Sequence, residues 1–341
     1  MNEKPEGDME TRKLGRTGPA VSALGLGAMG MSDFYGPADE AEGVATIHAA
    51  LDAGVNLIDT GDFYGSGHNE LMIGRALRDH KREDVVISVK FGGMRTPGGG
   101  FQPVGVDVGA AAVKDRLAYT LRRLGTDYVD VYRPARLNPA IPIEETVGAI
   151  KEMIDEGYVR HVGLSEVGAE TIRKAAAVHP VADLQIEYSL MSRGLEERIL
   201  PVTRELGIGV TAYGVLSRGL LSGHWRADRE LSVGDFRGHA PRFQGENLDA
   251  NLRLVEALRE IAEEQEATVA QVAIAWVLGR GDDIVPLVGA RTRERLAESL
   301  AAPRVTLTAR VLARIEAAVP AEAVAGTRYN TGGMASLDSE Q

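Results

Sequence analysis

The chain contains no cysteine among its 341 residues. Disulfide frameworks, thiolate metal sites and cysteine nucleophiles are therefore excluded. Basic residues are also in deficit, because 38 lysines and arginines face 49 aspartates and glutamates, which gives a net charge of −11. An acidic chain of this kind is a poor candidate for nonspecific nucleic-acid binding. No apolar run reaches the roughly 18 residues of a membrane span, so we expect no membrane insertion.

The rest of the composition, 44% hydrophobic and 26% charged residues, is typical of a soluble globular protein. The first ten residues lack the apolar core of a signal peptide, so we expect no export and a cytoplasmic location. Polar stretches at residues 1–10 and 321–341 are expected to be poorly ordered tails on one domain that spans residues 11–320.

Short apolar or β-branched runs alternate with longer amphipathic stretches, as in βα units around a parallel sheet. Four of the expected helices close on a glycine just before a strand, and we expect a left-handed helix cap at Gly54, Gly125, Gly157 and Gly207. The eight expected strands lie at residues 21–26, 55–58, 85–89, 128–132, 161–164, 184–187, 208–212 and 284–288. This pattern predicts an α/β protein with a single-domain (β/α)8 TIM barrel, and a long loop at residues 216–245 over its C-terminal mouth.

A G-x-G-x-x-G pattern at Gly25, Gly27 and Gly30 raises the alternative of a dinucleotide-binding fold. That fingerprint needs its third glycine to open the helix that receives the pyrophosphate. Here the segment MSDFYGPAD separates the third glycine from any helical pattern. The motif is therefore only weak evidence for a dinucleotide-binding fold in place of the barrel.

Three residues that could share acid–base chemistry lie at or after strand ends, where barrels place their active sites. Asp59 and Lys90 end neighbouring strands, and Tyr64 follows Asp59 in a glycine-containing loop. An ammonium near a phenol lowers the tyrosine pKa, and a carboxylate holds the ammonium charged. Tyr64 could then act as a general acid that protonates a carbonyl oxygen while hydride reaches its carbon. The alternative is a structural ion pair beside an exposed loop tyrosine.

A local basic cluster follows the last strand, where Arg291, Arg293 and Arg295 open a predicted helix. Free N–H groups at a helix start and guanidinium groups beside them bind phosphate well. The alternative is a solvated helix face stabilised by pairs at i,i+4 spacing.

Several motifs in order resemble those of the aldo-keto reductase superfamily, from about residue 12 to about residue 318. They are NLIDTGDFYGSGHNE, VISVKFG, DYVDVY, YVRHVGLSE, LQIEYSLMSR, VTAYGVLSRGLLSG and IVPLVGARTRERLAES. The chain is most similar to the bacterial NADPH-dependent branch. The resemblance implies a (β/α)8 barrel that reduces a small-molecule aldehyde or ketone to an alcohol with NADPH.

The resemblance also implies roles by position. Tyr64 would be the proton donor, with Lys90 and Asp59 as its partners. In the cofactor site, Ser165 and Gln185 would hold the nicotinamide carboxamide, Tyr213 would stack on its ring, and residues 214–219 would surround the pyrophosphate. Arg291 and Arg295 would contact the adenosine 2′-phosphate, which implies NADPH over NADH, and Glu298 would lie near the adenine. The full predicted cofactor set is Gly27, Met29, Asp59, Ser165, Glu166, Gln185, Tyr213, Gly214, Val215, Leu216, Ser217, Arg218, Gly219, Arg291, Arg295, Glu298 and Ser299.

The departure with the largest consequence is Ala135. The family usually reads Tyr-x-Leu-His-Arg after the fourth strand, and this chain reads Tyr132-Arg133-Pro134-Ala135-Arg136. Loss of that histidine leaves Tyr64 unassisted, or lets water or another side chain fill the gap. His68, in the same loop as Tyr64, is one candidate, and its alternative is an ordinary surface histidine.

Two further departures fall in the predicted cofactor site, where Glu166 and Ser299 each replace a common asparagine. Glu166 could accept a hydrogen bond from the carboxamide, could repel a phosphate or an acidic substrate, or could face solvent and do neither.

The predicted substrate pocket is lined by aromatic residues on loops, which suggests an apolar or aromatic carbonyl compound. Each of these side chains could equally pack its own loop. The pocket residues are Phe34, Tyr35, Ala135 and Trp225, with Phe243 and the glycine-rich loop RTPGGGFQPVG. None of the seven histidines shows metal-ligand spacing, so we expect no metal.

Two other classes of function stay open at this stage. A regulatory or interaction protein on the same barrel would bind NADPH with little or no turnover. The missing histidine at Ala135 is compatible with that hypothesis. A lyase of the class I aldolase type would use Lys90 as a Schiff-base nucleophile, but it leaves GARTRERL and AYGVLSRG unexplained. The sequence does not determine the oligomeric state.

Overall fold

A computed structural model describes residues 9–341 of the chain, so the first eight residues of the expected N-terminal tail lie outside the described part. Eight parallel strands close into a barrel in the order β10-β11-β12-β3-β4-β5-β8-β9. Their bounds are β3 Gly25–Gly27, β4 Leu57–Gly61, β5 Val86–Phe91, β8 Val129–Pro134, β9 Val159–Ser165, β10 Val181–Glu187, β11 Gly209–Tyr213 and β12 Ile284–Gly289. The predicted (β/α)8 barrel is confirmed.

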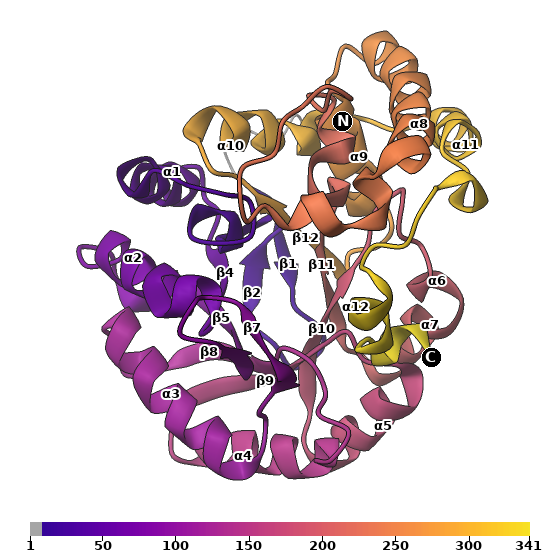
Figure 1. Ribbon diagram of the computed structural model, residues 1–341. Coiled ribbons are helices and arrows are strands. Elements are labelled where there is room, and N and C mark those ends of the chain that lie inside the picture. The colour runs from indigo at the N-terminus through magenta and orange to yellow at the C-terminus, as the bar shows by residue number, and fades with distance from the viewer. Residues whose placement is uncertain (1–8) are drawn as a thin grey trace, which may run out of the picture.

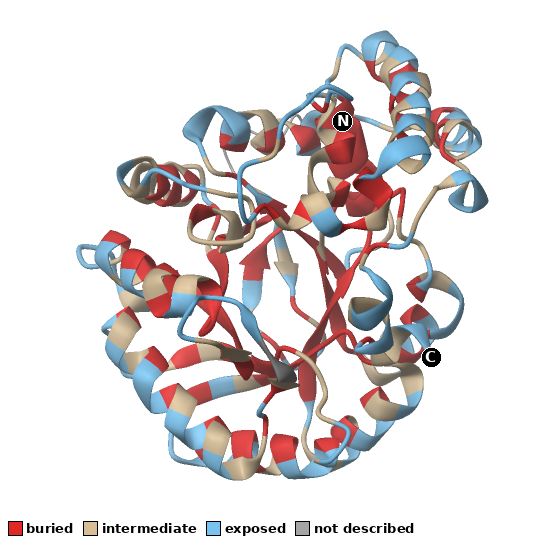
Figure 2. Cartoon of the chain, in the orientation of Figure 1, coloured by how far each residue is buried: buried red, intermediate tan, exposed pale blue. Residues whose placement is uncertain are grey.

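Residues 9–341 contain twelve α-helices, and most of them surround the barrel with their buried faces towards it (Figures 1 and 2). They are α1 Glu40–Asp52, α2 His68–Ala76, α3 Ala110–Leu124, α4 Ile143–Asp155, α5 Ala169–Val178, α6 Leu195–Arg198, α7 Leu200–Leu206, α8 Gly245–Glu264, α9 Val269–Leu278, α10 Arg293–Leu300, α11 Ala309–Ala318 and α12 Thr331–Ala335. The four predicted glycine caps are confirmed, because Gly54, Gly125, Gly157 and Gly207 have φ of 83°, 68°, 89° and 69°. Within residues 9–341, no helix is long and apolar enough to cross a membrane.

The expected first strand at residues 21–26 is wrong in its bounds. Residues Ala20–Ser22 form β2, which pairs with β1 (Thr11–Lys13) in an antiparallel hairpin. The barrel strand is the glycine-rich β3 that follows. A Cβ atom on Gly25 would lie 2.6 Å from Leu287 Cδ2 and 2.8 Å from Leu57 Cδ2, so a larger residue there would require these side chains to shift. The third glycine of the G-x-G-x-x-G pattern lies in a short 3-10 turn, Met29–Met31, and no long helix starts there.

Loops cover the C-terminal mouth of the barrel. The hairpin of β6 (Gly93–Arg95) and β7 (Phe101–Val106) follows β5. The long loop after β11 contains three 3-10 turns, η4 Ser217–Ser222, η5 Phe236–His239 and η6 Pro241–Phe243. The loop predicted at residues 216–245 is therefore present. It contains short turns that the hydrophobic pattern of the sequence does not predict.

The C-terminal segment differs from the poorly ordered tail that its polar composition suggested. It contains α12 and two 3-10 turns, η8 Ala321–Ala323 and η9 Asp338–Glu340, and it returns to the barrel (Figure 1). Leu337 is fully buried and Arg328 is 5% exposed. The Asp338 carboxylate accepts a hydrogen bond from the Gly168 backbone N–H at 2.7 Å, just before α5. We call residues 326–341 the strap.

Candidate active site

An ion pair between Asp59 and Lys90 lies at the mouth of the barrel, between neighbouring strands β4 and β5. Lys90 Nζ also donates to Gln185 Oε1 at 2.9 Å, and Gln185 Nε2 donates to Asp59 Oδ2 at 2.8 Å. Ser88 Oγ donates to the same carboxylate oxygen at 2.9 Å. All four side chains are buried. This closed set of hydrogen bonds fixes the ammonium group, because each buried charge has its partners.

Tyr64 lies directly after β4 and completes the predicted group, with its ring centre 5.3 Å from Lys90 Nζ. Burial raises the pKa of the Tyr64 phenol well above its usual value, and the charge of Asp59 raises it further. Burial lowers the pKa of Lys90, against the opposing effect of Asp59. The expectation that Lys90 leaves Tyr64 with a lowered pKa is therefore wrong for this structure, because burial dominates. The phenol keeps its proton and has one to donate.

A second ion pair, buried inside the barrel, was not expected from the sequence. Arg133 donates to Asp183 Oδ2 at 2.9 Å, and both side chains are completely buried. Thr211 Oγ1 donates to the same oxygen at 2.6 Å. Arg133 also donates to Ser88 Oγ at 2.7 Å, and Ser88 in turn contacts Asp59. The available signal was that Arg133 and Asp183 directly adjoin two of the expected strands, at residues 128–132 and 184–187.

An apolar cluster surrounds Tyr64. Phe63, Tyr64 and Ala135 form its buried part, and Met29 and Phe34 pack against them. The Phe34 ring meets the Tyr64 ring edge-on, with centroids 5.9 Å apart. Phe34 adopts the left-handed conformation with φ of 69°, which is strained for an aromatic residue and is often found at functional sites. The structure therefore brings Met29, Phe34 and Ala135 to the predicted proton donor.

The other three predicted pocket aromatics, Tyr35, Trp225 and Phe243, make their contacts outside that cluster. Trp225 is 8% exposed and packs on Phe243 with ring centroids 4.7 Å apart, within the main hydrophobic core. Its contacts support the long loop, which is the alternative that the sequence left open. The Tyr35 ring lies against the Arg237 guanidinium, whose central carbon is 4.6 Å from the ring centre. A large aromatic side chain gains more from burial under its own loop than from exposure in an open pocket.

His68 does not fill the position of the missing histidine. Its Nδ1 is hydrogen-bonded to Ser32 Oγ at 2.9 Å, and its Nε2 lies 3.2 Å from Glu40 Oε2. Both ring nitrogens are thus engaged away from the cluster around Tyr64. In the described part of the chain, no group of three or more histidine, aspartate or glutamate residues could hold a metal ion.

Two buried hydroxyl groups mark the predicted cofactor groove. Ser165 Oγ and Ser217 Oγ have no hydrogen-bond partner within residues 9–341. Ser165 ends β9, in register with Gln185 of β10, and Gly27 is in register with Asp59. Leaving a buried hydroxyl unpaired costs about 1–3 kcal/mol, so both positions suit the polar groups of a ligand. A carboxamide at Ser165 and a pyrophosphate at Ser217 fit these orphaned atoms.

The loop that holds Ser217 is built from unusual backbone conformations. Gly214, Ser217, Arg218 and Gly219 have φ of 65°, 46°, 55° and 105°. Left-handed conformations at residues other than glycine are costly and persist where surrounding contacts enforce them. Val215 and Leu220 anchor the loop in the hydrophobic core, while Leu216 packs against that core.

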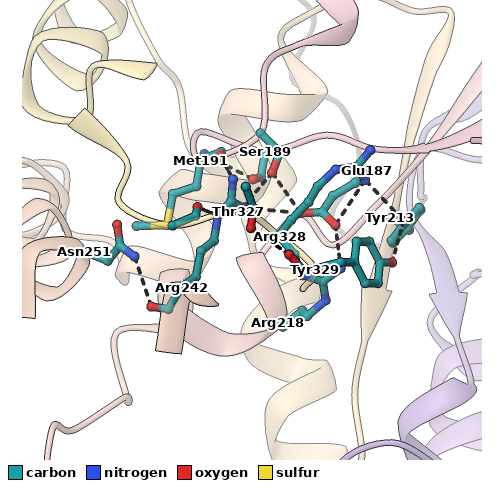
Figure 3. A network of polar contacts seen from close by, with 12 residues as sticks. Glu187, Ser189, Met191, Tyr213, Arg218, Arg242, Asn251, Thr327, Arg328 and Tyr329 are labelled. Atoms are coloured by element: carbon teal, nitrogen blue, oxygen red, sulfur yellow. Dashed lines mark hydrogen bonds and ion pairs between the residues drawn. The ribbon is translucent and has the colours of Figure 1, made fainter. Parts of the chain in front are cut away.

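The strap inserts Arg328 and Tyr329 into the same region, as Figure 3 shows. Arg328 donates to both carboxylate oxygens of Glu166, at 2.8 and 2.6 Å. Tyr213 donates to Glu166 Oε1 at 2.7 Å, and its hydroxyl lies 3.1 Å from that of Tyr329. Burial alone would raise the pKa of Glu166, but the hydrogen bonds and charge of Arg328 lower it to about 2. Glu166 therefore faces neither solvent nor an unpaired ligand amide, because Arg328 neutralises it.

Arg328→Met is expected to loosen the strap. Arg328 is the only guanidinium within ion-pair distance of Glu166 in the described part of the chain. Its loss leaves a buried carboxylate without a cationic partner, and detachment of the strap would relieve that cost. Hydrogen exchange in residues 326–341 is expected to accelerate about tenfold, which corresponds to about 1.4 kcal/mol. Arg226→Met, which breaks an exposed pair with Asp228, is the control, and equal protection in both variants would contradict the role of Arg328.

The predicted phosphate cluster lies at the start of α10. Arg291 donates to the Tyr35 carbonyl at 3.0 Å and to the Pro37 carbonyl, and has no carboxylate within ion-pair distance in residues 9–341. Arg295 contacts His224 Nε2 at 2.6 Å and Glu298 Oε2 at 3.1 Å. Ser299, in the same helix, is buried and donates to the Arg295 carbonyl at 3.1 Å. Arg291 thus keeps its positive charge uncompensated at this end of the groove.

Residues 23–320 match the aldo/keto reductase family over most of the chain. The chain belongs to this family. A curated relative from Glycine max, named "Probable aldo-keto reductase 1", is 40% identical over 321 residues, which is 94% of this chain and 92% of the relative. Membership places the protein among oxidoreductases that reduce small carbonyl compounds with a nicotinamide cofactor.

Solved structures of other aldo/keto reductases share the barrel. A glycerol dehydrogenase from Gluconobacter oxydans superposes with a TM-score of 0.80 at 29% identity, over 91% of this chain and 96% of that one. An aldo-keto reductase from Bacillus halodurans, solved in its holo form, gives 0.75 at 28% identity, over 92% and 97% of the two chains.

Proposed function

We propose that this aldo/keto reductase is an NADPH-dependent reductase of aldehydes or ketones in which Tyr64 is the proton donor. The observation that carries the proposal is the arrangement of Lys90, held by Asp59 and Gln185, with the Tyr64 ring 5.3 Å from its ammonium. A protonated phenol beside a fixed cation suits a carbonyl oxygen that gains negative charge as its carbon is reduced.

The reduction follows from what each side chain can do. NADPH, when bound, supplies the hydride. The Tyr64 hydroxyl transfers its proton to the carbonyl oxygen, and the nearby Lys90 ammonium stabilises the negative charge left on the phenolate. Asp59 keeps that ammonium charged and oriented. The apolar side chains around Tyr64 exclude water, which strengthens these interactions.

The cofactor contacts are proposed from the groove. Ser165 and Gln185 would hold the carboxamide, Tyr213 would stack on the nicotinamide ring, and residues 214–219 would surround the pyrophosphate through Ser217 and the loop backbone. Arg291 and Arg295 would bind the 2′-phosphate at the start of α10. Glu166 keeps Arg328 rather than the carboxamide as its partner.

The test is a titration of the purified protein with NADPH and NADH, followed by NADPH oxidation with a panel of aldehydes, diketones and quinones. Tight NADPH binding with turnover supports a reductase. Binding without turnover of any carbonyl favours the second candidate, a regulatory protein of the same fold, which the alanine at position 135 supports because that position has no acid or base.

Arg291→Ala is expected to weaken NADPH binding by about 10- to 100-fold, the range for loss of one charge-assisted hydrogen bond. NADH lacks the 2′-phosphate, so its affinity should change by less than about threefold. Fluorescence titration of both cofactors measures the two constants. Arg293→Ala, which breaks an exposed pair with Glu42, is the matched control. Equal losses for both cofactors would remove the assignment of the 2′-phosphate to this cluster.

The pH dependence follows from the raised pKa of Tyr64. A raised pKa means that the phenol stays protonated to higher pH, so its capacity as a proton donor is lost only above the usual tyrosine value of about 10. We expect kcat/KM for aldehyde reduction to show no loss assignable to Tyr64 between about pH 6 and about pH 9. Steady-state rates across that range check this, and a Tyr64-dependent fall near neutral pH would show that the phenol ionises more easily than its burial indicates.

A further inference from the structure

The guanidinium groups at the barrel mouth differ in their charge partners. Arg218 pairs with Glu187 at 2.7 Å, Arg242 with Glu187 at 3.4 Å, and Arg328 with Glu166 at 2.6 Å. Arg136 is partly buried in the same region, and no carboxylate lies within ion-pair distance of it in the described part of the chain. Arg136 therefore has no direct ion pair at the mouth. Burial lowers the pKa of its guanidinium group, but the surrounding negative charge, including that of the more distant Glu166, raises it above its usual value.

Arg136 is the neighbour of the residue that replaces the family histidine. It donates to the Ala135 carbonyl at 2.6 Å and to the Tyr329 hydroxyl at 3.3 Å. The Ala135 side chain packs in the cluster of Tyr64. The charge of Arg136 also reaches the reacting groups, because it lowers the pKa of Tyr64 against burial and Asp59. Arg136 thus lies between the proton donor and the strap.

A partly buried guanidinium group without a direct ion pair is available to an anion that binds beside it. A guanidinium group with free N–H donors binds carboxylates in a fixed geometry. Repulsion of an acidic substrate by Glu166, one of the alternatives that the sequence left open, is countered by the ion pair of that carboxylate with Arg328. The small side chain of Ala135 takes little space beside Tyr64.

We propose that Arg136 is a specificity-determining residue that binds an anionic group of the substrate, and that the substrate is a carbonyl compound carrying a carboxylate. The inference rests on the proposed reductase function for its turnover readout, but the binding step can be measured without turnover. In this arrangement the carboxylate lies at Arg136 while the carbonyl oxygen faces Tyr64. Arg136 takes over the positioning of the substrate that the family assigns to the missing histidine.

The experiment compares two probes with the same reacting aldehyde, 4-formylbenzoate and its methyl ester, of which only the first carries a negative charge. The wild-type protein, Arg136→Met, Arg136→Lys and Tyr329→Phe are each assayed for kcat and KM with NADPH. Benzoate binding to the same four proteins is measured by calorimetry, with and without NADP+. Arg173→Met, which breaks an exposed pair with Glu205, controls for the loss of one positive charge.

The expected result is that the wild type prefers the carboxylate by about 10- to 100-fold in kcat/KM, mostly through KM. Arg136→Met should abolish the preference, Arg136→Lys should retain part of it, and Tyr329→Phe and Arg173→Met should keep it. Equal kcat/KM for the two probes in the wild type, or a preference that survives in Arg136→Met, overturns the inference while the reductase function stands.

The two proposals fail in distinguishable ways. If neither probe is reduced but benzoate binds the wild type and not Arg136→Met, the anion site is supported and the reductase function is not. If benzoate binds all the variants equally, the anion lodges elsewhere, for instance in the pyrophosphate loop, and the assignment to Arg136 is wrong. Binding that NADP+ abolishes would identify that loop as its location.

Discussion

Tyr64→Phe is expected to lower kcat for carbonyl reduction by about 10²- to 10⁴-fold, the usual contribution of a general acid. The substitution removes only the hydroxyl group, so the ring still packs with Phe63 and Ala135. The Asp59–Lys90 pair keeps its bonds to Gln185, because none of them involves Tyr64. Affinity for NADPH should therefore change little. Single-turnover NADPH oxidation and a fluorescence titration measure the two effects.

Tyr119→Phe is the matched control. Tyr119 is 58% exposed on α3, so this substitution removes a hydroxyl group from the surface. Normal turnover by Tyr64→Phe would assign the proton transfer to another group or to water. Loss of NADPH binding together with turnover would instead show that Tyr64 supports the cofactor site.

Arg133→Met is expected to produce the largest loss of stability among the changes considered. It leaves the fully buried Asp183 carboxylate without its guanidinium partner. Breaking one side of a buried pair typically costs about 3–5 kcal/mol, because the remaining charge is desolvated and unpaired. Only the hydrogen bond from Thr211 then contacts that carboxylate oxygen. Thermal or denaturant unfolding measures the loss.

The double variant Arg133→Met/Asp183→Leu separates an unpaired charge from lost packing. It removes both charges and is expected to recover most of the stability, since well-packed apolar replacements of buried pairs are often neutral. Arg204→Met, which breaks a more exposed pair with Asp283, should cost about 1 kcal/mol or less. Wild-type stability in the single variant would mean that water or a rearranged Ser88 and Thr211 compensates Asp183.

The parts of the fold that local physics dictates could be predicted from the sequence. A glycine before a strand caps a helix wherever the chain must turn with positive φ, and all four predicted positions do so. Seven of the eight strands lie in the expected runs, because alternating βα units leave few topologies open. The prediction of the first strand was wrong in its bounds. Strand β3 consists of Leu26 between two glycines, so it has almost no hydrophobic pattern to detect.

Strand ends also made Asp59 and Lys90 predictable, because a barrel gathers the C-terminal ends of its strands on one rim. The contact of Lys90 with Gln185 spans 95 positions in the sequence. No local sequence pattern predicts the contact between Lys90 and Gln185, although the resemblance had placed Gln185 at the cofactor. The direction of the Tyr64 pKa shift was mispredicted for a related reason. The spacing of the residues indicates that Lys90 is near, but it does not show that the phenol is buried, and burial raises the pKa.

The sequence by itself therefore determined the barrel, the helix caps and the residue types at the strand ends, since these depend on local conformational preferences and on periodicity. Only the tertiary structure decided how charges are paired. Arg328 meets Glu166 across 162 positions, and Arg133 meets Asp183 across 50. The energy of a buried charge depends on what lies within a few ångströms in space, and that neighbourhood exists only once the chain has folded. For the same reason, Arg136 was one more basic residue in the sequence, and the fold leaves it without a carboxylate partner beside Tyr64.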